Sequence, residues 1–449
     1  MEILIIGGDA AGMSAASQVR RRHRDWTITV LERGAFTSYA ACGIPYYLAG
    51  DVPSADDLVV VTPESFRAKR NIDVRMGWEA LSLELPDRRV VARRPDRTVE
   101  RLAFDRLLLA TGASPVVPPW EGTDLSGVVL MRNLSDAAMI SEQLAKGARR
   151  AVVIGAGYVG LEAVEAFRRR GLEITVLEKQ ATTMGGIAPE ISSQVEEELA
   201  SHGVDLRLAT TVTGLLGDGS RVRAVATDGG EFPCDLCLIS LGVRPNSQLA
   251  EAAGIRLGVR GAIAVDDRQR TGAPEVFAAG DCAEALHRVT GRPVYIPLAL
   301  TANRQGRVAG ANLAGDDERF PGIVGSAVTR VFDLTIARTG LTPEQAEEAG
   351  FARQRVVATS PSRAHYFPGH VPLYVELIFD GPSRRILGGQ LAGRDPSVAK
   401  RCDVVAVAVT AGLTIDEVAG LDLTYAPPFA PVWDPVLQAA NRALFTRDS

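Results

Sequence analysis

The sequence predicts an α/β protein with two doubly wound domains and a third domain of α+β type. The chain uses one plan twice, from Ile3 to Glu32 and from Ala151 to Glu178: an apolar strand, a glycine-rich turn, a helix, a second strand and a Glu. That plan is typical of Rossmann-like, nucleotide-binding domains. From about Pro321 the pattern changes, because strands such as Leu373 to Phe379 and a helix around Ala399 to Ala411 follow without a glycine turn.

The composition is that of an ordinary globular protein of 449 residues, enough for three domains at roughly 150 residues each. With 49 basic and 54 acidic residues the net charge is −5, which excludes a general nucleic-acid binder because such proteins need a basic surface. Five cysteines argue against a disulfide framework and for a reducing compartment. No charge-free apolar stretch reaches the roughly 18 residues of a membrane helix, so we expect a cytoplasmic protein without membrane contacts.

The first glycine turn keeps Gly7 and Gly12 but has Asp9 where the middle glycine belongs, and Glu32 closes the repeat. Alone this turn is ambiguous. Together with the second repeat and a late apolar strand that ends at Asp281, it indicates a flavin site. Asp281 lies at the carboxyl end of its strand, where ligands of open α/β sheets bind. It either accepts a hydrogen bond from a ribitol hydroxyl or caps a following helix, and the sequence leaves both open.

The second turn is a complete G-x-G-x-x-G fingerprint formed by Gly155, Gly157 and Gly160, between a strand and a helix. Its glycines let the backbone approach a pyrophosphate, which the helix N-terminus then stabilises. Glu178 follows where a carboxylate can accept both ribose hydroxyls but would repel a 2′-phosphate. This favours NADH, although the neighbouring Lys179 keeps NADPH as an alternative.

Two strand-to-turn exits, Leu107 to Gly112 and Leu238 to Asn246, indicate where the chain crosses between domains. We therefore expect a first nucleotide-binding domain over residues 1–113, a second over 114–241, a return to the first over 242–320, and the third domain over 321–449.

The stretch from Ser38 to Tyr47 contains Cys42 shortly after the first repeat. A cysteine at a helix N-terminus is stabilised as the thiolate by the helix dipole and becomes nucleophilic near neutral pH. A cysteine in a loop is otherwise more often an inert small hydrophobe. The pair Cys234 and Cys237 lies in an apolar strand, where residues three apart point to opposite faces, so we expect neither a disulfide nor a metal site.

Taken together, the two glycine turns, Thr111-Gly112, Gly242 to Asn246, Ala279 to Asp281 and the Cys42 motif resemble the pyridine nucleotide–disulfide oxidoreductases. The resemblance spans the whole chain and implies a FAD domain, an inserted NAD(P)H domain, a return to the FAD domain and a C-terminal dimerisation domain. By this resemblance the FAD contacts are Gly7, Gly12, Glu32, Ala80, Thr111, Gly112, Arg132, Asp281 and Ala299. The implied NAD(P)H contacts are Gly155, Gly157, Val159, Gly160, Glu178 and Gly242.

Three features of the sequence indicate the branch of the family. Glutathione-reductase types have a second cysteine where this chain has Tyr47, so Cys42 resembles the redox nucleophile of the single-cysteine branch. NADH oxidases and peroxidases of that branch have a His where this chain has Ala10. The first helix, Ser17 to Arg21, instead resembles coenzyme A-disulfide reductases, and the basic run Arg20 to Arg24 suits an anionic 3′-phospho-ADP group. The implied coenzyme A contacts are Ser14, Gln18, Arg21, Ser38, Arg70 and Asn303.

Two tyrosines near the end of the chain complete the resemblance. Tyr366 and Tyr425 match a family pair that reaches the cysteine of the partner subunit, where a phenol can donate a proton to a leaving thiolate. Phe367 departs from relatives that have a second Tyr there, and we choose Tyr366 as the residue that faces the site. The resemblance thus implies a homodimer with active sites shared between subunits.

We therefore expect a FAD-dependent enzyme that uses NADH, with NADPH as an alternative, to reduce coenzyme A disulfide to two coenzyme A thiols through a Cys42 mixed disulfide. Three alternatives remain. The same cycle could act on persulfide or polysulfide sulfur, the enzyme could be an NADH oxidase or peroxidase, or the chain could be a non-catalytic, NADH-responsive flavoprotein dimer that signals.

Overall fold

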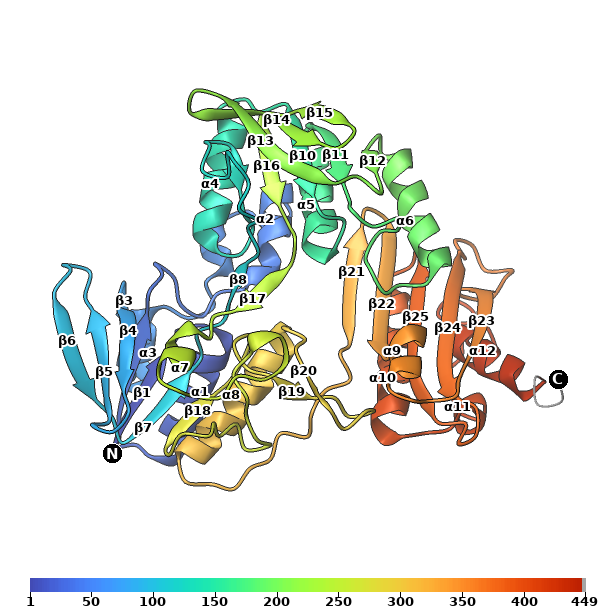
Figure 1. Ribbon diagram of the computed structural model, residues 1–449. Helices are drawn as coiled ribbons and strands as arrows, with labels where there is room; N and C mark the ends of the chain where they lie inside the picture. Colours follow the sequence, from blue (N-terminus) through green and yellow to red (C-terminus); the bar gives the residue numbers. More distant parts are fainter. Residues whose placement is uncertain (446–449) are drawn as a thin grey trace.

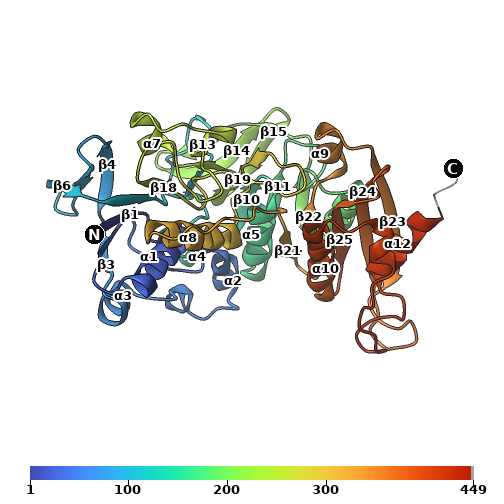
Figure 2. The same cartoon turned by 90° about the horizontal axis from the view of Figure 1, so that it is seen from below.

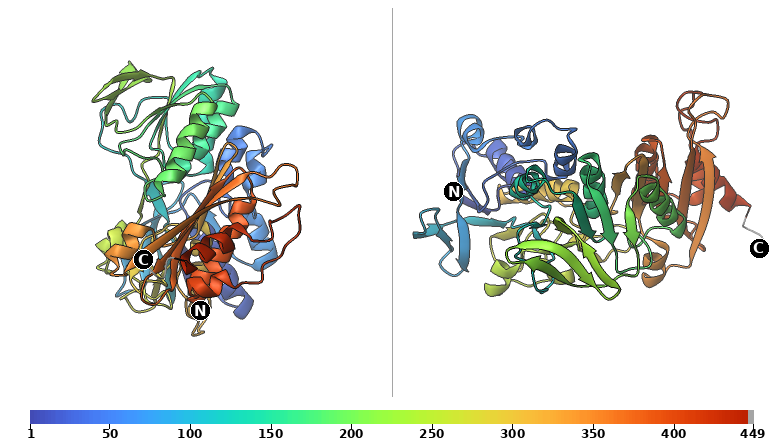
Figure 3. Two further views of the ribbon diagram at one scale, coloured as in Figure 1. Left: turned by 90° about the vertical axis from the view of Figure 1, so that its right-hand side faces the viewer. Right: turned by 90° about the horizontal axis from the view of Figure 1, so that it is seen from above.

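The structure is a computed structural model that describes residues 1–445. Three bodies lie around a central junction (Figure 1): the N-terminal body with the returning segment, a second body above it, and the C-terminal body on the other side. Views from the side and from above show the same three-part arrangement (Figure 3). Within the described residues, no helix combines the length and the apolar composition that crossing a membrane requires.

The first body is built on a parallel sheet whose strands alternate with helices, as the first repeat predicts. In spatial order the strands are β18 (Val276–Ala278), β7 (Arg106–Leu109), β1 (Glu2–Ile6), β2 (Thr27–Glu32) and β3 (Asp73–Met76). The strands are mostly apolar because both faces of the sheet are covered. Helices cover one face, and a small sheet covers the other; this sheet consists of β4 (Glu79–Glu84), β5 (Arg89–Arg93) and β6 (Val99–Ala103).

Helices α1 (Ala10–Arg22) and α8 (Ala299–Leu313) lie side by side on this sheet although almost the whole chain separates them (Figure 2). Two glycines of α8 make the close approach possible. A β-carbon at Gly306 would lie 2.3 Å from the carbonyl oxygen of Ala11, and one at Gly310 would lie 2.5 Å from that of Ala15. This crossing joins the returning segment to the first repeat.

The second repeat forms its own parallel sheet. In spatial order its strands are β12 (Asp205–Arg207), β11 (Glu173–Leu177), β10 (Arg150–Ile154), β16 (Leu236–Ile239) and β9 (Val128–Val129). Its helices are α4 (Leu134–Ala145), α5 (Tyr158–Arg169) and α6 (Pro189–Ser201), and a three-stranded sheet of β13 (Val212–Asp218), β14 (Arg221–Thr227) and β15 (Gly230–Pro233) packs on it.

The two crossings between these bodies lie next to each other. Strands β8 (Ala113–Pro115) and β17 (Val243–Pro245) pair antiparallel, and the Asn246 side chain donates a 2.9 Å hydrogen bond to the Thr111 carbonyl. Both exits that the sequence indicates are therefore parts of one two-stranded connection. The division of the chain at residues 113, 241 and 320 stays a prediction.

The C-terminal body is the predicted α+β domain. Its antiparallel sheet has the order β21 (Ala327–Val331), β22 (Leu334–Gly340), β25 (Ile386–Gly393), β24 (Pro372–Asp380) and β23 (Arg353–Pro361). The helices of this body are α9 (Pro343–Glu348), α10 (Ser397–Ala411), α11 (Ile415–Ala419) and α12 (Pro435–Leu444). Leu373, Val375 and Leu377 of β24 are fully buried in the core that these helices share with the sheet.

Short elements complete the first body. After β2 come the 3-10 turn η1 (Ala41–Gly43), α2 (Ile44–Ala49), η2 (Ala55–Leu58) and α3 (Pro63–Arg70), and the returning segment contains α7 (Gln248–Ala252), η3 (Val259–Gly261), β19 (Ala285–Leu286) and β20 (Pro293–Val294). Strand β18 leads into a turn and then β19, so no helix follows Asp281 directly and the helix-capping alternative for Asp281 is wrong.

Candidate active site

The first glycine turn is packed too tightly for any side chain at its outer positions. Gly7 has φ +109°, and a β-carbon there would lie 2.0 Å from the Ala110 carbonyl oxygen. A β-carbon at Gly12 would lie 1.9 Å from the Gly7 carbonyl oxygen. Asp9 has an extended φ of −115°, which any residue adopts, so the missing middle glycine leaves the turn intact.

The acids that close the two repeats hold their turns in the same way. The Gly8 and Gly34 amides donate to the two carboxylate oxygens of Glu32, at 2.7 and 2.6 Å. The Ala156 and Gln180 amides donate to the two oxygens of Glu178, both at 2.8 Å. Each carboxylate oxygen has a further lone pair, so either acid can still accept bonds from ribose hydroxyls.

A cavity of about 590 Å³ runs along the first glycine turn. Among its lining residues are Gly7, Glu32, Ala80, Thr111 and, from the crossing strands, Asn246. The turn that admits only glycine, the ribose-accepting acid and this elongated cavity fit the adenosine and pyrophosphate parts of FAD.

The remaining predicted FAD residues lie nearby. The Arg132 guanidinium donates a 2.7 Å hydrogen bond to the Asp281 carboxylate, and a β-carbon at Gly112 would lie 4.0 Å from the same guanidinium. Ala299 is the first residue of α8, so its amide is among those that have no partner within the helix. These residues come from β7, β9, β18 and α8, and only the fold brings them together.

The second fingerprint has the same geometry as the first. Gly155 has φ +104°, and a β-carbon there would lie 2.3 Å from the Ser240 carbonyl oxygen, whereas Gly157 has open space around it where α5 begins. Val159 and Gly242 line a cavity of about 170 Å³ together with Cys42 and Arg132. Two of the six predicted NAD(P)H contacts and the predicted nucleophile therefore line one cavity.

Glu162 is a residue of this cavity that sequence reasoning missed. It lies on α5 and accepts a 2.9 Å hydrogen bond from the Thr329 hydroxyl of β21. Burial raises the pKa of its carboxyl, and the bond from Thr329 opposes that shift. Glu162 follows a fingerprint glycine, but no spacing rule marks it.

Cys42 lies in η1, two residues before the first residue of α2, as the helix-terminus argument requires. Helix α2 is held against α5, because the Arg169 guanidinium forms two 2.6 Å bonds to the Asp51 carboxylate and Arg170 donates to the Leu48 carbonyl. The expected lowering of the thiol pKa is wrong. Burial is the largest effect and, with the nearby Glu162 carboxylate, raises the pKa of Cys42, while Arg132 opposes this.

A separate groove of about 240 Å³ contains all six residues that the resemblance assigns to coenzyme A. They come from α1, the Cys42 loop, α3 and α8. The Ser14 hydroxyl donates a 2.8 Å bond to Asn303, and Arg70 donates a 2.8 Å bond to Ser17. Ser38 lines the groove and lies on the same loop as Cys42, so the groove lies beside the nucleophile's loop.

The groove is cationic. Arg21, Arg70 and Arg307 line it, and no Asp or Glu is among the lining residues. Within residues 1–445, neither Arg21 nor Arg307 forms an ion pair. Arg307, one turn after Asn303 on α8, is a residue that sequence reasoning missed, because an isolated Arg on a helix carries no motif. Three guanidinium groups without carboxylates suit a ligand with several phosphates.

Tyr366 and Tyr425 lie far along the sequence from the residues of the Cys42 cavity. They do not line that cavity in their own chain. Tyr366 is 64% exposed and Tyr425 is 46% exposed, and a hydrogen bond between their side chains raises the pKa of Tyr425. Large apolar side chains that are also exposed in this part of the chain are Phe429, Val432 and Trp433. Such an exposed aromatic surface is typical of a protein–protein interface.

The other cysteines are buried free thiols. The expectation that Cys234 and Cys237 point to opposite faces is wrong: Cys234 precedes β16, and both thiols lie in one apolar core. Burial raises the pKa of Cys234 to about 12 and also raises that of Cys237 well above its ordinary value, so both stay protonated.

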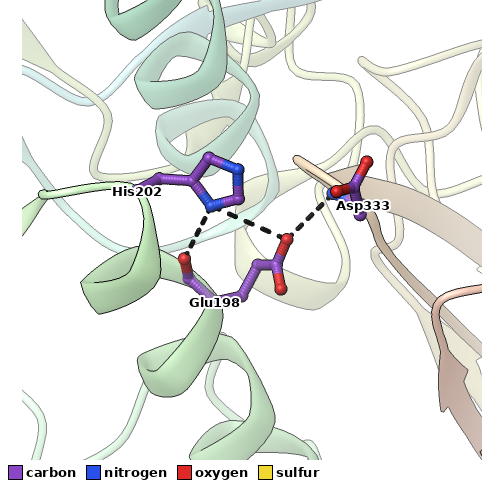
Figure 4. Close-up of side chains that lie close together, drawn as sticks. All are labelled: Glu198, His202 and Asp333. Carbon is purple, nitrogen blue, oxygen red and sulfur yellow. Dashed lines mark hydrogen bonds and ion pairs between the residues drawn. The ribbon is translucent and has the colours of Figure 1, made fainter.

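Glu198, His202 and Asp333 are close enough together to bind a metal ion (Figure 4). The buried Glu198 carboxylate, however, accepts from the Asp333 amide at 3.0 Å and from Arg394, and the His202 ring stacks on Phe332 at 3.8 Å. These contacts hold α6 against the turn between β21 and β22. Glu198, His202 and Asp333 therefore have a structural role.

Family models match most of the chain. One described as pyridine nucleotide-disulphide oxidoreductase matches residues 1–306, and one described as the dimerisation domain of that family matches residues 326–435.

Individual relatives match over the full length. The NAD(P)H coenzyme A polysulfide/persulfide reductase of Pyrococcus horikoshii is 38% identical over 442 residues, 98% of each chain. The coenzyme A disulfide reductase of Staphylococcus haemolyticus is 29% identical over 98% of this chain and 99% of its own. A solved NAD-dependent persulfide reductase from A. fulgidus has a TM-score of 0.97 at 39% identity, covering 100% of this chain and 84% of that one. The chain therefore belongs to the pyridine nucleotide-disulphide oxidoreductase family and is a FAD-dependent enzyme that uses NAD(P)H to reduce a disulfide-type substrate.

Proposed function

We propose that this enzyme reduces coenzyme A persulfide, or polysulfide in the presence of coenzyme A, to hydrosulfide at the expense of NADH. The observation that carries this is the cationic groove, in which Arg21, Arg70 and Arg307 lie beside the loop of Cys42. The names of the relatives from Pyrococcus and A. fulgidus support persulfide as the sulfur substrate. They favour this alternative over coenzyme A disulfide, the substrate expected from the sequence.

The sulfur chemistry follows from one thiolate. The Cys42 thiolate attacks the carbon-bound sulfur of coenzyme A persulfide, forms a Cys42–coenzyme A disulfide and releases hydrosulfide. Two electrons from NADH and one proton then break that disulfide, which restores the Cys42 thiolate and releases coenzyme A thiol. The balance is one persulfide and one NADH consumed, and one thiol, one hydrosulfide and one NAD⁺ formed.

Bound FAD supplies the two-electron relay between nicotinamide and sulfur. The residues proposed to hold it are Glu32 at the adenosine end, the Gly7 turn at the pyrophosphate, and Arg132 with Asp281 toward the Cys42 cavity. Glu178 is proposed to bind the ribose hydroxyls of NADH. Because its carboxylate would repel a 2′-phosphate, we expect NADH to be preferred over NADPH.

The proton that the departing coenzyme A sulfur takes up is proposed to come from the partner subunit. Tyr366 and Tyr425 share a hydrogen bond on an exposed surface of the dimerisation domain and do not line the Cys42 cavity of their own chain. In a two-fold dimer the same surface of one subunit can reach the site of the other. A phenol held there donates to the departing sulfur.

Coenzyme A disulfide is a second candidate substrate, since its attack by Cys42 gives the same mixed disulfide and differs only in the leaving group, a coenzyme A thiolate. The same groove would hold it. Ala10 offers no imidazole in the first glycine turn, which argues against an oxidase or peroxidase.

The test is NADH oxidation by the holoenzyme, measured anaerobically with coenzyme A persulfide, coenzyme A disulfide and free polysulfide, and in a separate assay with oxygen. We expect turnover with the coenzyme A substrates that is lost in Cys42→Ser. Arg21→Ala, Arg70→Ala and Arg307→Ala should each raise KM for coenzyme A persulfide about tenfold while leaving free polysulfide unaffected. Arg24→Ala, an exposed residue of the same basic run outside the groove, is the control. Turnover only with free polysulfide or only with oxygen would contradict the proposal.

A further inference from the structure

The two loops that carry the exposed tyrosines meet at one buried guanidinium. Arg401 lies on α10, is 6% exposed, and its Nε donates a 2.8 Å bond to the Asp434 carboxylate, which is 8% exposed. Burying an ion pair costs desolvation energy that the pair rarely recovers, and an apolar pair of similar size often serves stability as well. Arg401 and Asp434 therefore call for an explanation other than stability.

The other donors of Arg401 supply that explanation. One terminal nitrogen, Nη2, donates to the Ser362 carbonyl at 2.9 Å and to the Phe429 carbonyl at 3.4 Å. The second terminal nitrogen donates to the Ser397 hydroxyl of its own helix. The planar guanidinium thus connects the loop that contains Tyr366 with the loop that contains Tyr425.

Each loop is closed at the point where Arg401 binds it. The Ser362 amide donates to Val371 at 2.8 Å and the Ser362 hydroxyl accepts from the Val371 amide at 3.3 Å, which closes the base of the Tyr366 loop. On the other loop, Asp434 accepts from the Val436 amide at 2.9 Å and so begins α12.

Direct contacts between the loops complete the arrangement. The Ala364 amide donates to the Pro427 carbonyl at 3.2 Å, and the side chains of Tyr366 and Tyr425 share a hydrogen bond. Arg363 pairs with Asp395 at 3.0 Å beside the base of the first loop. Polar contacts at the buried base therefore set the spacing of two phenols at the exposed tip.

We infer that Arg401 is the positioning residue of the shared active site: through Ser362, Phe429 and Asp434 it fixes the two tyrosine loops in the geometry that reaches the partner's Cys42. This inference rests on the proposed role of the tyrosines. A Lys at this position keeps the charge but cannot bind three oxygen acceptors from one plane, so it should leave the domain folded with the loops loosened.

The experiment compares Arg401→Lys and Asp434→Asn with the double variant Tyr366→Phe/Tyr425→Phe in the holoenzyme. Stopped-flow measurements under anaerobic conditions separate flavin reduction by NADH from its reoxidation by coenzyme A persulfide. We expect the loop variants to slow reoxidation about tenfold or more, as the tyrosine variant does, while flavin reduction and dimer mass stay unchanged. Arg384→Lys, in an ion pair with Asp416 of the same domain, is the matched control.

Hydrogen exchange of residues 362–371 and 424–430 gives a readout that needs no substrate, and faster exchange in Arg401→Lys and Asp434→Asn than in Arg384→Lys is expected. If the tyrosine variant is slow but both loop variants reoxidise and exchange like wild type, the inference about Arg401 is overturned and the proposed function stands. If wild type does not turn over coenzyme A persulfide, the proposed function fails, and the exchange rates alone decide whether Arg401 holds the loops. Reoxidation at the full rate in the tyrosine variant overturns the inference.

Discussion

Asp9 shows how one residue can depart from a glycine fingerprint without breaking it. Its backbone is extended, and its side chain, instead of capping α1, accepts a 3.3 Å hydrogen bond from the Tyr39 amide in the loop that leads to Cys42. Burial and the nearby Glu32 carboxylate raise the pKa of Asp9 to about 6, although the Tyr39 amide and Arg132 oppose that shift. Below about pH 6 the carboxyl therefore keeps its proton and presents less negative charge to a pyrophosphate at the same turn.

This shift makes the stability of the holoenzyme pH-dependent. Between the ordinary pKa of 3.8 and about 6, the folded state holds the Asp9 proton while the unfolded state releases it, so the free energy of unfolding falls as pH rises. The loss attributable to Asp9 is at most about 3 kcal/mol, because each pKa unit is worth about 1.4 kcal/mol. We expect Asp9→Asn to remove it.

The measurement is urea unfolding of wild type and Asp9→Asn at pH 4.5 and pH 7. The variant should gain stability relative to wild type on going to pH 7. Equal differences between the two proteins at both pH values would show that Asp9 does not titrate in this range. Asp87→Asn, an exposed site in the turn between β4 and β5, is the control.

At the scale of elements, the site depends on close approaches between segments distant in the chain. The groove proposed to bind coenzyme A lies between α1, α3 and α8, and α1 meets α8 through Gly306 and Gly310. The periodicity of either helix predicts a buried face but not its partner. The spacing of Ser14 and Asn303, which share a hydrogen bond, follows from this crossing.

Gly310→Val should therefore damage both fold and groove. Its first side-chain carbon would lie 2.5 Å from the Ala15 carbonyl oxygen, and the helices would have to separate. We expect a loss of about 3 kcal/mol in the free energy of unfolding, together with weaker coenzyme A binding, measured by urea unfolding and calorimetric titration. Gly185→Val, where nothing lies within 4 Å and φ is not positive, is the matched control and should change neither quantity. Wild-type stability of Gly310→Val would mean that the two helices are not in close contact.

For the whole molecule, the separation of Cys42 from the tyrosines is decisive. The groove and cavity are formed by the N-terminal and central bodies, whereas Tyr366 and Tyr425 are exposed on the dimerisation domain. Contacts such as Glu198 with Arg394 and Glu165 with Arg330, at 2.7 Å, hold the central body against that domain. The proposed role of the tyrosines therefore requires a second copy of the chain to complete the site.

Subunit mixing tests this arrangement. Cys42→Ser and Tyr366→Phe/Tyr425→Phe homodimers should both be poorly active. In a mixed dimer, the cysteine of one subunit meets the tyrosines of the other, so one of its two sites is complete. After random exchange half of the dimers are mixed, and activity should recover to about a quarter of wild type. No recovery, with mixed dimers demonstrated by mass spectrometry, would place the tyrosines outside the shared site.

The sequence by itself determined the fold class, both glycine turns with Glu32 and Glu178, and the position of Cys42, the proposed nucleophile, at the start of a helix. These are local features, because glycine conformation, strand-to-helix spacing and helix N-termini depend on residues near one another in the chain. The resemblance added residues scattered from Ser14 to Asn303, and the structure brings these into one groove.

Only the tertiary structure decided the roles of Arg307, Glu162 and Arg401, and the raised pKa of Cys42. None of these residues belongs to a motif. Arg307 lines the groove together with residues of α1 and α3, Glu162 accepts a hydrogen bond from Thr329, and Arg401 donates to Ser362 and Asp434, all far away in the sequence. The thiol pKa depends on burial and on carboxylates contributed by other segments, which a count of helix positions does not include. Contacts between segments far apart in the chain create these environments. A sequence motif identifies residues but does not show which distant residues will surround them.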